Sequence, residues 1–246
     1  MTRVYAGAAT WSPDEPGPVV AIGNFDGVHA GHRAVLGELF ALAAELGAPS
    51  CVLTFEPAPT AVLAPERHQP RILPVADRVR LLGEAGVDVV VVEPFDRDFA
   101  ARSARAFAED LLGRTMRVRG VVVGYDFRFG QGREGTADAL RAWLPGVRGV
   151  EVGAHGEGGA PVSSSRIRRL VATGAVDEAA GLLGRPHALV GTVVHGDQRG
   201  RTIGFPTANV ANEVELLPAA GVYAVRARVD DGPPMPGVAN IGVRPT

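Results

Sequence analysis

The chain has 246 residues, of which 46% are hydrophobic and 21% charged, so it is long enough for one large or two modest globular domains. Its formal net charge of −2 excludes a general attraction to nucleic acid or to an anionic membrane, so any phosphate site must be local. All 25 basic residues are arginine, which excludes Schiff-base catalysis and any phosphate-binding loop that needs lysine.

From residue 18 onward, short β-rich runs alternate with longer segments of helical period, which predicts a parallel sheet covered by helices. The apolar residues of segment 30–47 fall on one face of a helix, and Gly47 ends it. Segment 87–95 is dense in valine, as a strand buried on both faces should be. We expect the first sixteen residues to be loosely attached. The predicted strands span 18–25, 50–57, 87–95, 119–127 and 147–154, and the predicted helices span 30–47, 76–86, 103–115 and 137–144.

The pattern of predicted elements changes in the last third of the chain. Two consecutive helices are predicted over 163–174 and 177–184. From His187 onward, short β runs are broken by glycine, proline and Asp-Gly turns, without a helical period. We therefore expect a first domain over 1–184 and a second, a β-barrel or small sheet, over 185–246.

The single cysteine, Cys51, lies in the apolar run SCVLTF, where we expect a buried and inert thiol. The N-terminal residues show neither a long apolar core nor a cleavage pattern. No stretch approaches the roughly 18 uninterrupted apolar residues of a membrane span. We expect a cytoplasmic protein without a membrane partner.

The segment GNFDGVHAGH, residues 23–32, joins the first predicted strand to the first long helix. Ligands of open α/β sheets bind at the carboxyl ends of the strands, and a helix N-terminus favours phosphate. His29 and His32 can therefore face one phosphate from a single turn and donate hydrogen bonds as charge builds on it. For this pair alone a capping turn with two exposed histidines is the alternative, and zinc lacks further ligands.

Two other segments carry polar chemistry. In SSSRIRRL, residues 163–170, serine hydroxyls, a helix start and two guanidinium groups can bind the β- and γ-phosphates of a nucleotide, although a capped surface helix would look the same. The glycines at 130, 132 and 135 make a formal G-x-G-x-x-G. We reject a dinucleotide site there, because this run follows FRF rather than a clean strand and has no clear acidic partner downstream.

These motifs resemble, in order and spacing, those of the bacterial bifunctional riboflavin kinase/FAD synthetases, and GNFDGVHAGH is similar to the HxGH signature of nucleotidylyltransferases. The resemblance implies a doubly wound, Rossmann-like α/β nucleotidylyltransferase domain followed by a riboflavin-kinase-type β-barrel. The other segments that carry it are TFEP at 54–57, PF at 94–95, GYDFRFG at 124–130, SSSRIRRL at 163–170, LGRPHALVGTVVHGDQRGRTIGFPTANV at 183–210, GVYAV at 221–225 and NIGVRPT at 240–246.

The resemblance implies transfer of AMP from ATP to FMN, which yields FAD and pyrophosphate. It implies catalytic roles for His29, His32, Arg166 and Arg168. The residues implied for ATP binding are Gly23, Asn24, Phe25, Asp26, Ser164 and Ser165, and those implied for flavin binding are Pro57, Pro59, Asp126, Phe127 and Phe129.

Two positions depart from the family pattern. Ala58 stands where the family usually has histidine, which puts substrate positioning or rate in doubt. Ser165 replaces a threonine and keeps the hydroxyl, so little loss is expected.

The C-terminal segment resembles a riboflavin kinase that phosphorylates riboflavin with ATP. The resemblance implies that Thr207 and Asn209 hold the Mg²⁺ of the nucleotide. The chain stops directly after NIGVRPT, before the catalytic glutamate of the kinase family, so we expect an incomplete barrel without riboflavin phosphorylation. The residues implied for nucleotide binding in this part are Gly196, Gly200, Arg201, Gly204, Thr207 and Asn209.

Three alternatives stay open at this point. One is a related enzyme that adenylylates or cytidylylates another phosphate or acid. The second is a flavin or nucleotide sensor without activity. The third is RNA binding through Arg199 and Arg201, which is disfavoured because no aromatic series is present to stack on bases, so we expect no nucleic-acid partner. The sequence does not set the oligomeric state.

Overall fold

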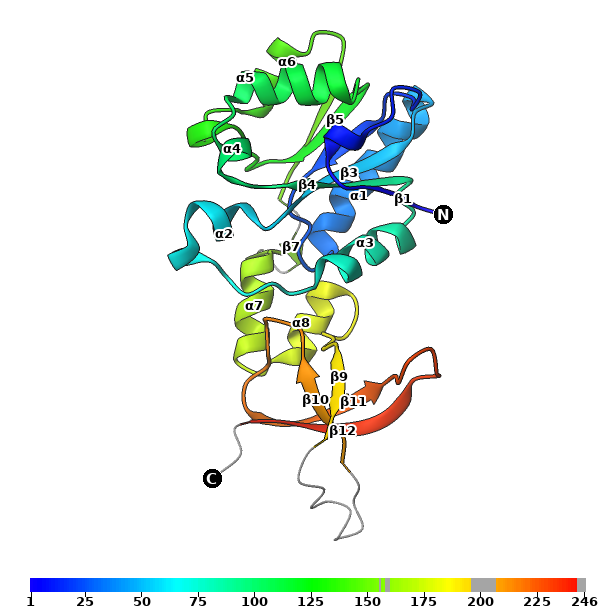
Figure 1. Cartoon of the computed structure of the whole chain (residues 1–246), viewed down its shortest axis with the longest axis vertical. Helices are drawn as coiled ribbons and strands as arrows, with labels where there is room; N and C mark the ends of the chain where they lie inside the picture. The colour runs from blue at the N-terminus through cyan, green and yellow to red at the C-terminus, as the bar shows by residue number, and fades with distance from the viewer. Residues whose placement is uncertain (155, 158–159, 196–206, 243–246) are drawn as a thin grey trace. The chain divides into compact units, whose positions relative to one another are not determined.

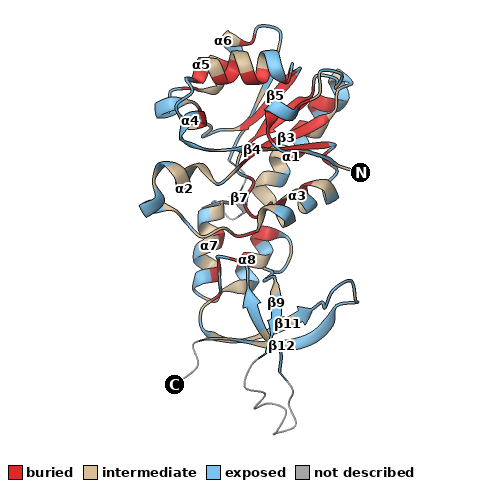
Figure 2. Cartoon of the chain, viewed as in Figure 1, coloured by how far each residue is buried: buried red, intermediate tan, exposed pale blue. Residues whose placement is uncertain are grey.

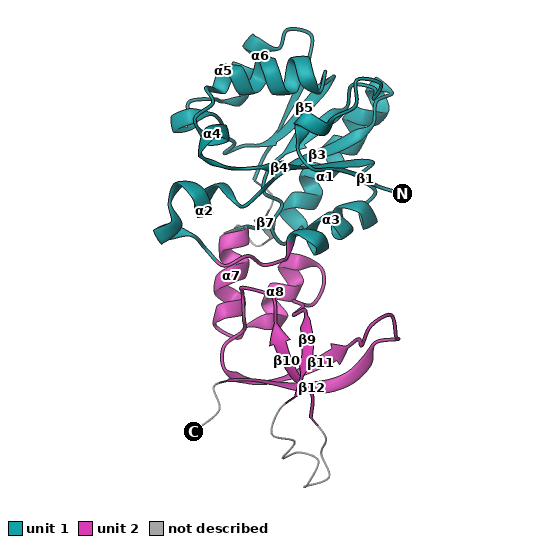
Figure 3. Cartoon of the chain, viewed as in Figure 1, with its two compact units in different colours: residues 1–69, 75–163 teal, residues 70–74, 164–246 magenta. Residues whose placement is uncertain are grey.

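The chain folds into two compact units (Figures 1 and 3). The computed structural model describes residues 1–154, 156–157, 160–195 and 207–242. Residues 1–69 and 75–163 form the first unit, and residues 70–74 and 164–246 form the second. This division by contacts falls between residues 163 and 164, whereas the domain boundary expected from sequence lies at residue 184 and stays a prediction.

The first unit is built on a parallel sheet of six strands in the order β1-β4-β3-β2-β5-β6, which confirms the predicted α/β class. The chain runs from β2 outward through β3 to β4 and then returns to the other side of β2 for β5 and β6. This reversal beside β2 is the topological switch point, where ligands of such sheets bind. The strands are β1 Arg3–Tyr5, β2 Val19–Ile22, β3 Ser50–Glu56, β4 Val89–Pro94, β5 Gly120–Gly124 and β6 Arg148–Val152.

Helices cover both faces of this sheet, so the central strands are buried on both sides (Figure 2). Helix α1 packs against β2, β3, β5 and β6, and Gly47 ends it in the left-handed conformation, as predicted. Val20 and Ile22 of β2 join the core cluster formed with η3 and α6. The helices are α1 Ala30–Leu46, α2 Pro59–Leu63, α3 Val75–Glu84, α4 Arg97–Ala100, α5 Ala104–Ala106 and α6 Ala137–Trp143, with the 3₁₀ turns η1 Ala8–Thr10, η2 Pro65–Arg67 and η4 Gln131–Arg133 and the π-helix η3 Phe107–Thr115.

The expectation of a buried and inert cysteine is confirmed. Cys51 is fully buried in β3, and burial raises the pKa of its thiol far above the usual range. A thiolate, the reactive form, is therefore absent at neutral pH.

The expectation of a loosely attached N-terminus is wrong. Arg3–Tyr5 adds a parallel strand to the edge of β4, and Trp11 is only 5% exposed. The ring of Trp11 packs on Tyr5, whose hydroxyl donates to Glu15. The cause is the unpaired edge that β4 would otherwise present, which this short strand satisfies without any periodicity visible in the sequence.

The second unit combines two helices with two small antiparallel sheets. The predicted helices are present as α7, Ser164–Ala172, and α8, Val176–Leu183. Segment 70–74 belongs here as well, and Arg71 pairs with Glu215. The antiparallel pairs are β9 Gly191–Val194 with β10 Asn209–Asn212, and β11 Gly221–Ala227 with β12 Met235–Ile241.

The predicted β character of the C-terminal segment is confirmed, and its closure into a barrel stays a prediction. Within the described residues, the four strands form two separate two-stranded sheets. Val193, Val210, Val222 and Val238 are exposed on them. A two-stranded sheet alone is marginally stable, so these strands depend on packing against other elements. A further hairpin, β7 Gly156–Glu157 with β8 Ala160–Pro161, belongs to the first unit.

The attachment of the N-terminal segment can be tested at Trp11. Its indole N–H finds no acceptor among the described residues, so truncation removes packing without losing a hydrogen bond. We predict that Trp11→Ala lowers the free energy of unfolding by about 3–5 kcal/mol in urea titrations. Val4→Ala, at an exposed position of β1, is the control and should change it by less than about 0.5 kcal/mol. Equal effects of the two substitutions would contradict the packing described here.

Candidate active site

The loop between β2 and α1 lies at the carboxyl end of β2 and follows a strained path. Phe25 and Val28 have positive φ angles of 49° and 41°, and Gly27 lies between them at 90°. A left-handed backbone is a genuine outlier for a β-branched residue such as Val28. The side chains of Phe25 and Val28 are buried and fix the loop from below. Strain of this kind, of order 1–3 kcal/mol per residue, is concentrated at ligand sites.

His29 and His32 cap helix α1 through each other. The Nδ1 atom of His29 accepts a hydrogen bond from the backbone N–H of His32 at 3.3 Å, and Nδ1 of His32 accepts from the backbone N–H of His29 at 3.4 Å. The rings stack with their centroids 3.6 Å apart. Because both Nδ1 atoms are acceptors, each neutral imidazole carries its proton on Nε2. The pair is thus a capping turn, but His29 is 4% exposed, which contradicts the alternative of two exposed histidines.

The environment keeps His32 neutral. Burial lowers the pKa of His32 well below its usual value, and electrostatic interactions with His29 and Arg78 lower it further. At neutral pH the imidazole is therefore a hydrogen-bond donor through Nε2 rather than a cation.

Gly31, between the two histidines, leaves space that a side chain would fill. A Cβ atom there would lie 3.1 Å from the carbonyl oxygen of Val162 and 3.2 Å from the imidazole of His29. A side chain at position 31 would therefore require the carbonyl of Val162 or the ring of His29 to shift by a few tenths of an ångström. The contact also places Val162, which directly precedes the serine run at 163–165, beside the start of α1.

The remaining residues of the loop are anchored by their backbone. Gly23 donates its N–H to the carbonyl of Leu53 at 3.1 Å, which continues the pairing of β2 with β3. Asp26 is buried, whereas Asn24 is exposed. The carbonyl of Asn24 accepts hydrogen bonds from the hydroxyl of Thr54 and the guanidinium of Arg78, each at 3.0 Å. Sequence analysis missed Arg78, because an arginine in an amphipathic helix is typical of a surface position.

The serine–arginine motif begins helix α7. Ser164 is half-buried, Ser165 is exposed, and Arg166 and Arg168 are half-buried. Nε of Arg168 donates to the carbonyl of Pro70 at 2.9 Å, so part of its guanidinium holds the chain in place. The predicted action of these residues on the same nucleotide as the histidines stays a prediction.

The residues expected on the flavin side differ in exposure. Pro57 and Asp126 are exposed, and Pro59 is half-buried at the first turn of α2. Phe127 is half-buried and stacks on Phe129 with ring centroids 5.4 Å apart. Phe129 itself is 7% exposed and belongs to the core with Phe107 and Trp143, so it supports Phe127 from below. Ala58 is the residue that precedes α2 and offers no side-chain cap. The roles of these residues toward flavin stay predictions.

Two glycines of the formal G-x-G-x-x-G have steric explanations. Gly130 has a φ of 75°, and a Cβ there would lie 2.4 Å from the backbone of Ala104. A Cβ at Gly135 would lie 2.7 Å from the ring of Phe129, which forms a β-bridge with Gly135. Packing therefore explains Gly130 and Gly135, whereas Gly132 has open space around it and a positive φ of 64°.

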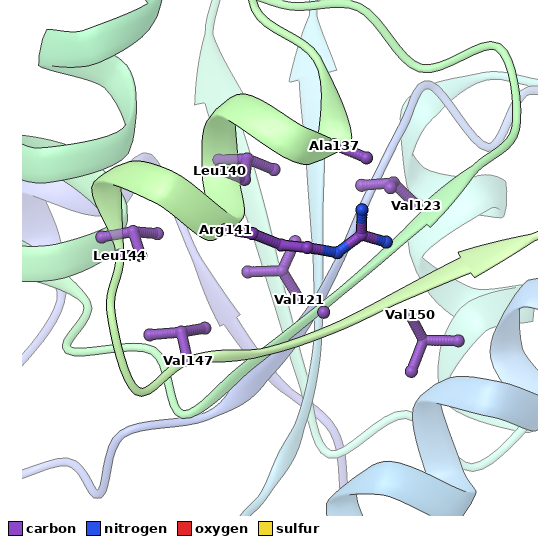
Figure 4. Close-up of a pocket in the computed structure, with 9 residues that line it drawn as sticks. Val121, Val123, Ala137, Leu140, Arg141, Leu144, Val147 and Val150 are labelled. Carbon is purple, nitrogen blue, oxygen red and sulfur yellow. The ribbon is translucent and has the colours of Figure 1, made fainter.

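An apolar pocket lies between α6 and the strands β5 and β6 (Figure 4). Its cavity volume is about 20 Å³, which suffices for roughly one water molecule. None of the residues predicted for ATP or flavin lines it, so this pocket is not the expected nucleotide site. The lining residues are Val121, Val123, Ala137, Leu140, Arg141, Leu144, Val147, Gly149 and Val150.

Comparison with known proteins agrees with these observations. The profile of the FAD synthetase family matches residues 12–166, and that of the riboflavin kinase family matches residues 183–246. The chain belongs to the bifunctional riboflavin kinase/FMN adenylyltransferase family. It is 45% identical to the bifunctional riboflavin kinase/FMN adenylyltransferase of Escherichia coli K12, over 96% of this chain and 75% of that protein. It is 41% identical to the Listeria monocytogenes protein of the same name, over 91% of this chain and 72% of that protein.

A solved structure from Streptococcus pneumoniae, described as a macrolide-efflux protein, is 32% identical with a TM-score of 0.86. The match covers 98% of this chain and 79% of that one. In the part of the present chain that the structure describes, no helix has the length and apolar character needed to cross a bilayer. The likeness supports a shared fold.

The kinase motif of the family is partly covered by the structure. Gly196, Gly200, Arg201 and Gly204 lie outside the described residues. Thr207 is exposed, and Asn209 is half-buried at the start of β10. No group of three or more histidine, cysteine, aspartate or glutamate residues is placed to hold a metal ion in the described ranges. A hydroxyl and an amide oxygen are neutral ligands that suit Mg²⁺ when nucleotide phosphates complete its shell.

The lowered pKa of His32 can be tested through the pH dependence of stability. In the unfolded chain His32 takes up a proton below its usual pKa of about 6.5, whereas in the folded chain it stays neutral to a much lower pH. The folded state therefore loses stability as the pH falls below about 6.5, by up to about 1.4 kcal/mol per pH unit for this group. We predict that His32→Gln flattens the free energy of unfolding between about pH 7.5 and about pH 5, measured in urea.

Other titrating groups do not obscure this comparison. Burial also lowers the pKa of His187, which contributes with the same sign, and burial raises the pKa of Glu93, which contributes with the opposite sign. Both groups are present in wild type and variant, so the difference between the two stability curves gives the contribution of His32. Parallel curves would show that His32 titrates normally in the folded protein.

Proposed function

We propose that this chain transfers AMP from ATP to FMN at the loop between β2 and α1. The observation that carries the proposal is the reciprocal imidazole cap at the start of α1, because it presents two neutral N–H donors at the switch point of the sheet. The identity of 45% to a protein named for this activity supports it. The proposal assigns adenylyl transfer to residues 1–184, and residues 185–246 to the riboflavin-kinase part of the family.

In this reaction an oxygen of the FMN phosphate forms a bond to the α-phosphorus of ATP. The bond from that phosphorus to the bridging oxygen of the β-phosphate breaks, and its electron pair leaves with pyrophosphate. A phosphate monoester is largely ionised at neutral pH, since its second pKa is about 6, so no general base is needed. A neutral His32 is compatible with such a mechanism, because its task is to donate a hydrogen bond rather than to take a proton.

The histidines and the arginines are proposed to bind different phosphates of the nucleotide. The Nε2–H groups of His29 and His32 donate to the non-bridging oxygens of the α-phosphate, where negative charge builds in the transition state. Ser164, Ser165 and the start of α7 bind the β- and γ-phosphates together with Arg166 and Arg168, and thereby help pyrophosphate leave.

The flavin and the metal ion are bound by the other predicted residues. We propose that FMN lies against Pro57, Pro59, Asp126 and the aromatic pair of Phe127 and Phe129. Thr207 and Asn209 would hold Mg²⁺ with the nucleotide of the kinase part, where the ion neutralises charge on the phosphates. A cytoplasmic location and the absence of nucleic-acid partners stay predictions.

The proposal is tested by replacing the imidazoles. We predict that purified protein with FMN, ATP and Mg²⁺ produces FAD and pyrophosphate in equal amounts. His29→Ala and His32→Ala should each lower kcat by about 10²–10³, because each removes one donor to the transition state. Products are measured by chromatography and a pyrophosphate assay. The control is His195→Ala, an exposed histidine of the second unit, which should retain wild-type kcat.

The same measurements separate the enzyme from the alternatives. A sensor would bind FMN and ATP but form no FAD, and its ligand response would survive both alanine substitutions. A related transferase would release pyrophosphate only with another acceptor. Absence of both FAD and pyrophosphate with wild-type protein overturns the proposal.

A further inference from the structure

Arg78 is the largest fully buried side chain among the residues that the structure describes, with 2% of it exposed. It lies in α3, and its guanidinium reaches two segments that precede it in the chain. Its Nη1 donates to the carbonyl of Asn24 at 3.0 Å, and its Nη2 donates to the carbonyl of Phe55 at 3.2 Å. Nη2 also pairs with the carboxylate of Glu56 at 3.0 Å. A buried cation persists only with such partners, so its position is tightly specified.

The carbonyl of Asn24 is the point at which the loop between β2 and α1 begins to turn. It accepts hydrogen bonds from Arg78 and from the buried hydroxyl of Thr54, so α3 and β3 hold the same oxygen. The next residue, Phe25, has the first of the positive φ angles. Strained backbone of this kind persists only where the surroundings over-determine it. These two donors supply that constraint immediately before the histidines.

We propose that Arg78 is a positioning residue for adenylyl transfer, whose guanidinium clamps the loop to the end of β3 and so holds His29 and His32 in their reciprocal cap. This inference deepens the proposed function and rests on it. Arg78 acts through the loop and is not assigned a contact with substrate.

The charge of Arg78 acts in the same direction as its hydrogen bonds. Together with burial and His29, it lowers the pKa of His32. The negative charge of Glu56 pairs with the guanidinium of Arg78, and the pKa of His32 is nevertheless lowered. The clamp therefore favours the neutral imidazoles whose Nδ1 atoms accept the capping hydrogen bonds.

The kinetic test compares two arginines of the same helix. Arg80 is exposed and pairs with Asp77 and Glu84, so Arg80→Gln is a control of equal chemical change. We predict that Arg78→Gln lowers kcat for FAD formation by about 10–100-fold at saturating FMN and ATP, since a misplacement of about 1 Å can cost this much. The KM for ATP should stay within about threefold. Arg78→Lys, which keeps the charge but donates from a single nitrogen, should recover part of the loss, and Arg80→Gln should match wild type.

A spectroscopic readout makes the inference independent of turnover. In wild type, ¹⁵N-detected NMR should report the Nε2–H tautomer for both His29 and His32. In Arg78→Gln the signals should change to mixed tautomers, and His32 should titrate at a higher pH than in wild type. A purely structural role for Arg78 would lower the folded fraction but leave the tautomers of the remaining folded protein unchanged.

The outcomes separate the two proposals. If wild type and Arg80→Gln form no FAD, the proposed function fails, and the tautomers alone decide on Arg78. If Arg78→Gln retains both wild-type kcat and wild-type tautomers, the positioning role is overturned. Should Arg78→Gln not fold, Thr54→Val removes the other donor to the Asn24 carbonyl. It should lower kcat by about 3–10-fold and shift the same tautomers, as loss of about one hydrogen bond implies. If Thr54→Val leaves both kcat and the histidine tautomers as in wild type, the inference is overturned.

Discussion

The reciprocal hydrogen bonding of His29 and His32 is the interaction on which the proposed chemistry depends. It satisfies two backbone N–H groups at the start of α1, and it fixes the tautomer of both rings in the same step. Because the backbone occupies the Nδ1 atoms, the N–H of each neutral ring lies on Nε2. The same two hydrogen bonds therefore cap the helix and set the tautomers on which the proposed chemistry depends.

The electrostatics of the site follow from this arrangement and from the absence of lysine in the chain. The pKa of His32 is lowered and the chain contains no lysine, so positively charged side chains for a triphosphate are supplied by arginine. Arg166 and Arg168 are the residues proposed for that task, at the start of α7. Arg78 has a different role, because it is buried and its guanidinium is turned to the backbone of the loop and to Glu56.

The family assignment covers both halves of the chain, but one position of the predicted site, Ala58, departs from the family pattern. Ala58 stands directly before α2 without any side-chain hydrogen bond, where the resemblance implies a histidine. The neighbouring Pro57 and Pro59 keep the surface that the resemblance assigns to flavin. The consequence of the missing imidazole is therefore expected in the rate of the reaction rather than in the fold.

The sequence by itself determined the alternation of strands and helices, the extent of α1 with its glycine stop, and the place of the HxGH motif between β2 and α1. These features rest on hydrophobic period, capping residues and turn residues, all of which act within a few positions of one another. The family resemblance also came from the sequence alone, because it depends on the order of short motifs.

Only the tertiary structure decided which polar groups meet. Arg78 is 54 residues from Asn24 and 22 from Glu56, and nothing in the amphipathic pattern of α3 distinguishes it from the exposed Arg80. The pairing of Arg3–Tyr5 with β4 and the proximity of Gly31 to Val162 join parts of the chain that are even further apart in sequence. Such contacts are set by the folding of the whole sheet, so local periodicity carries no signal of them.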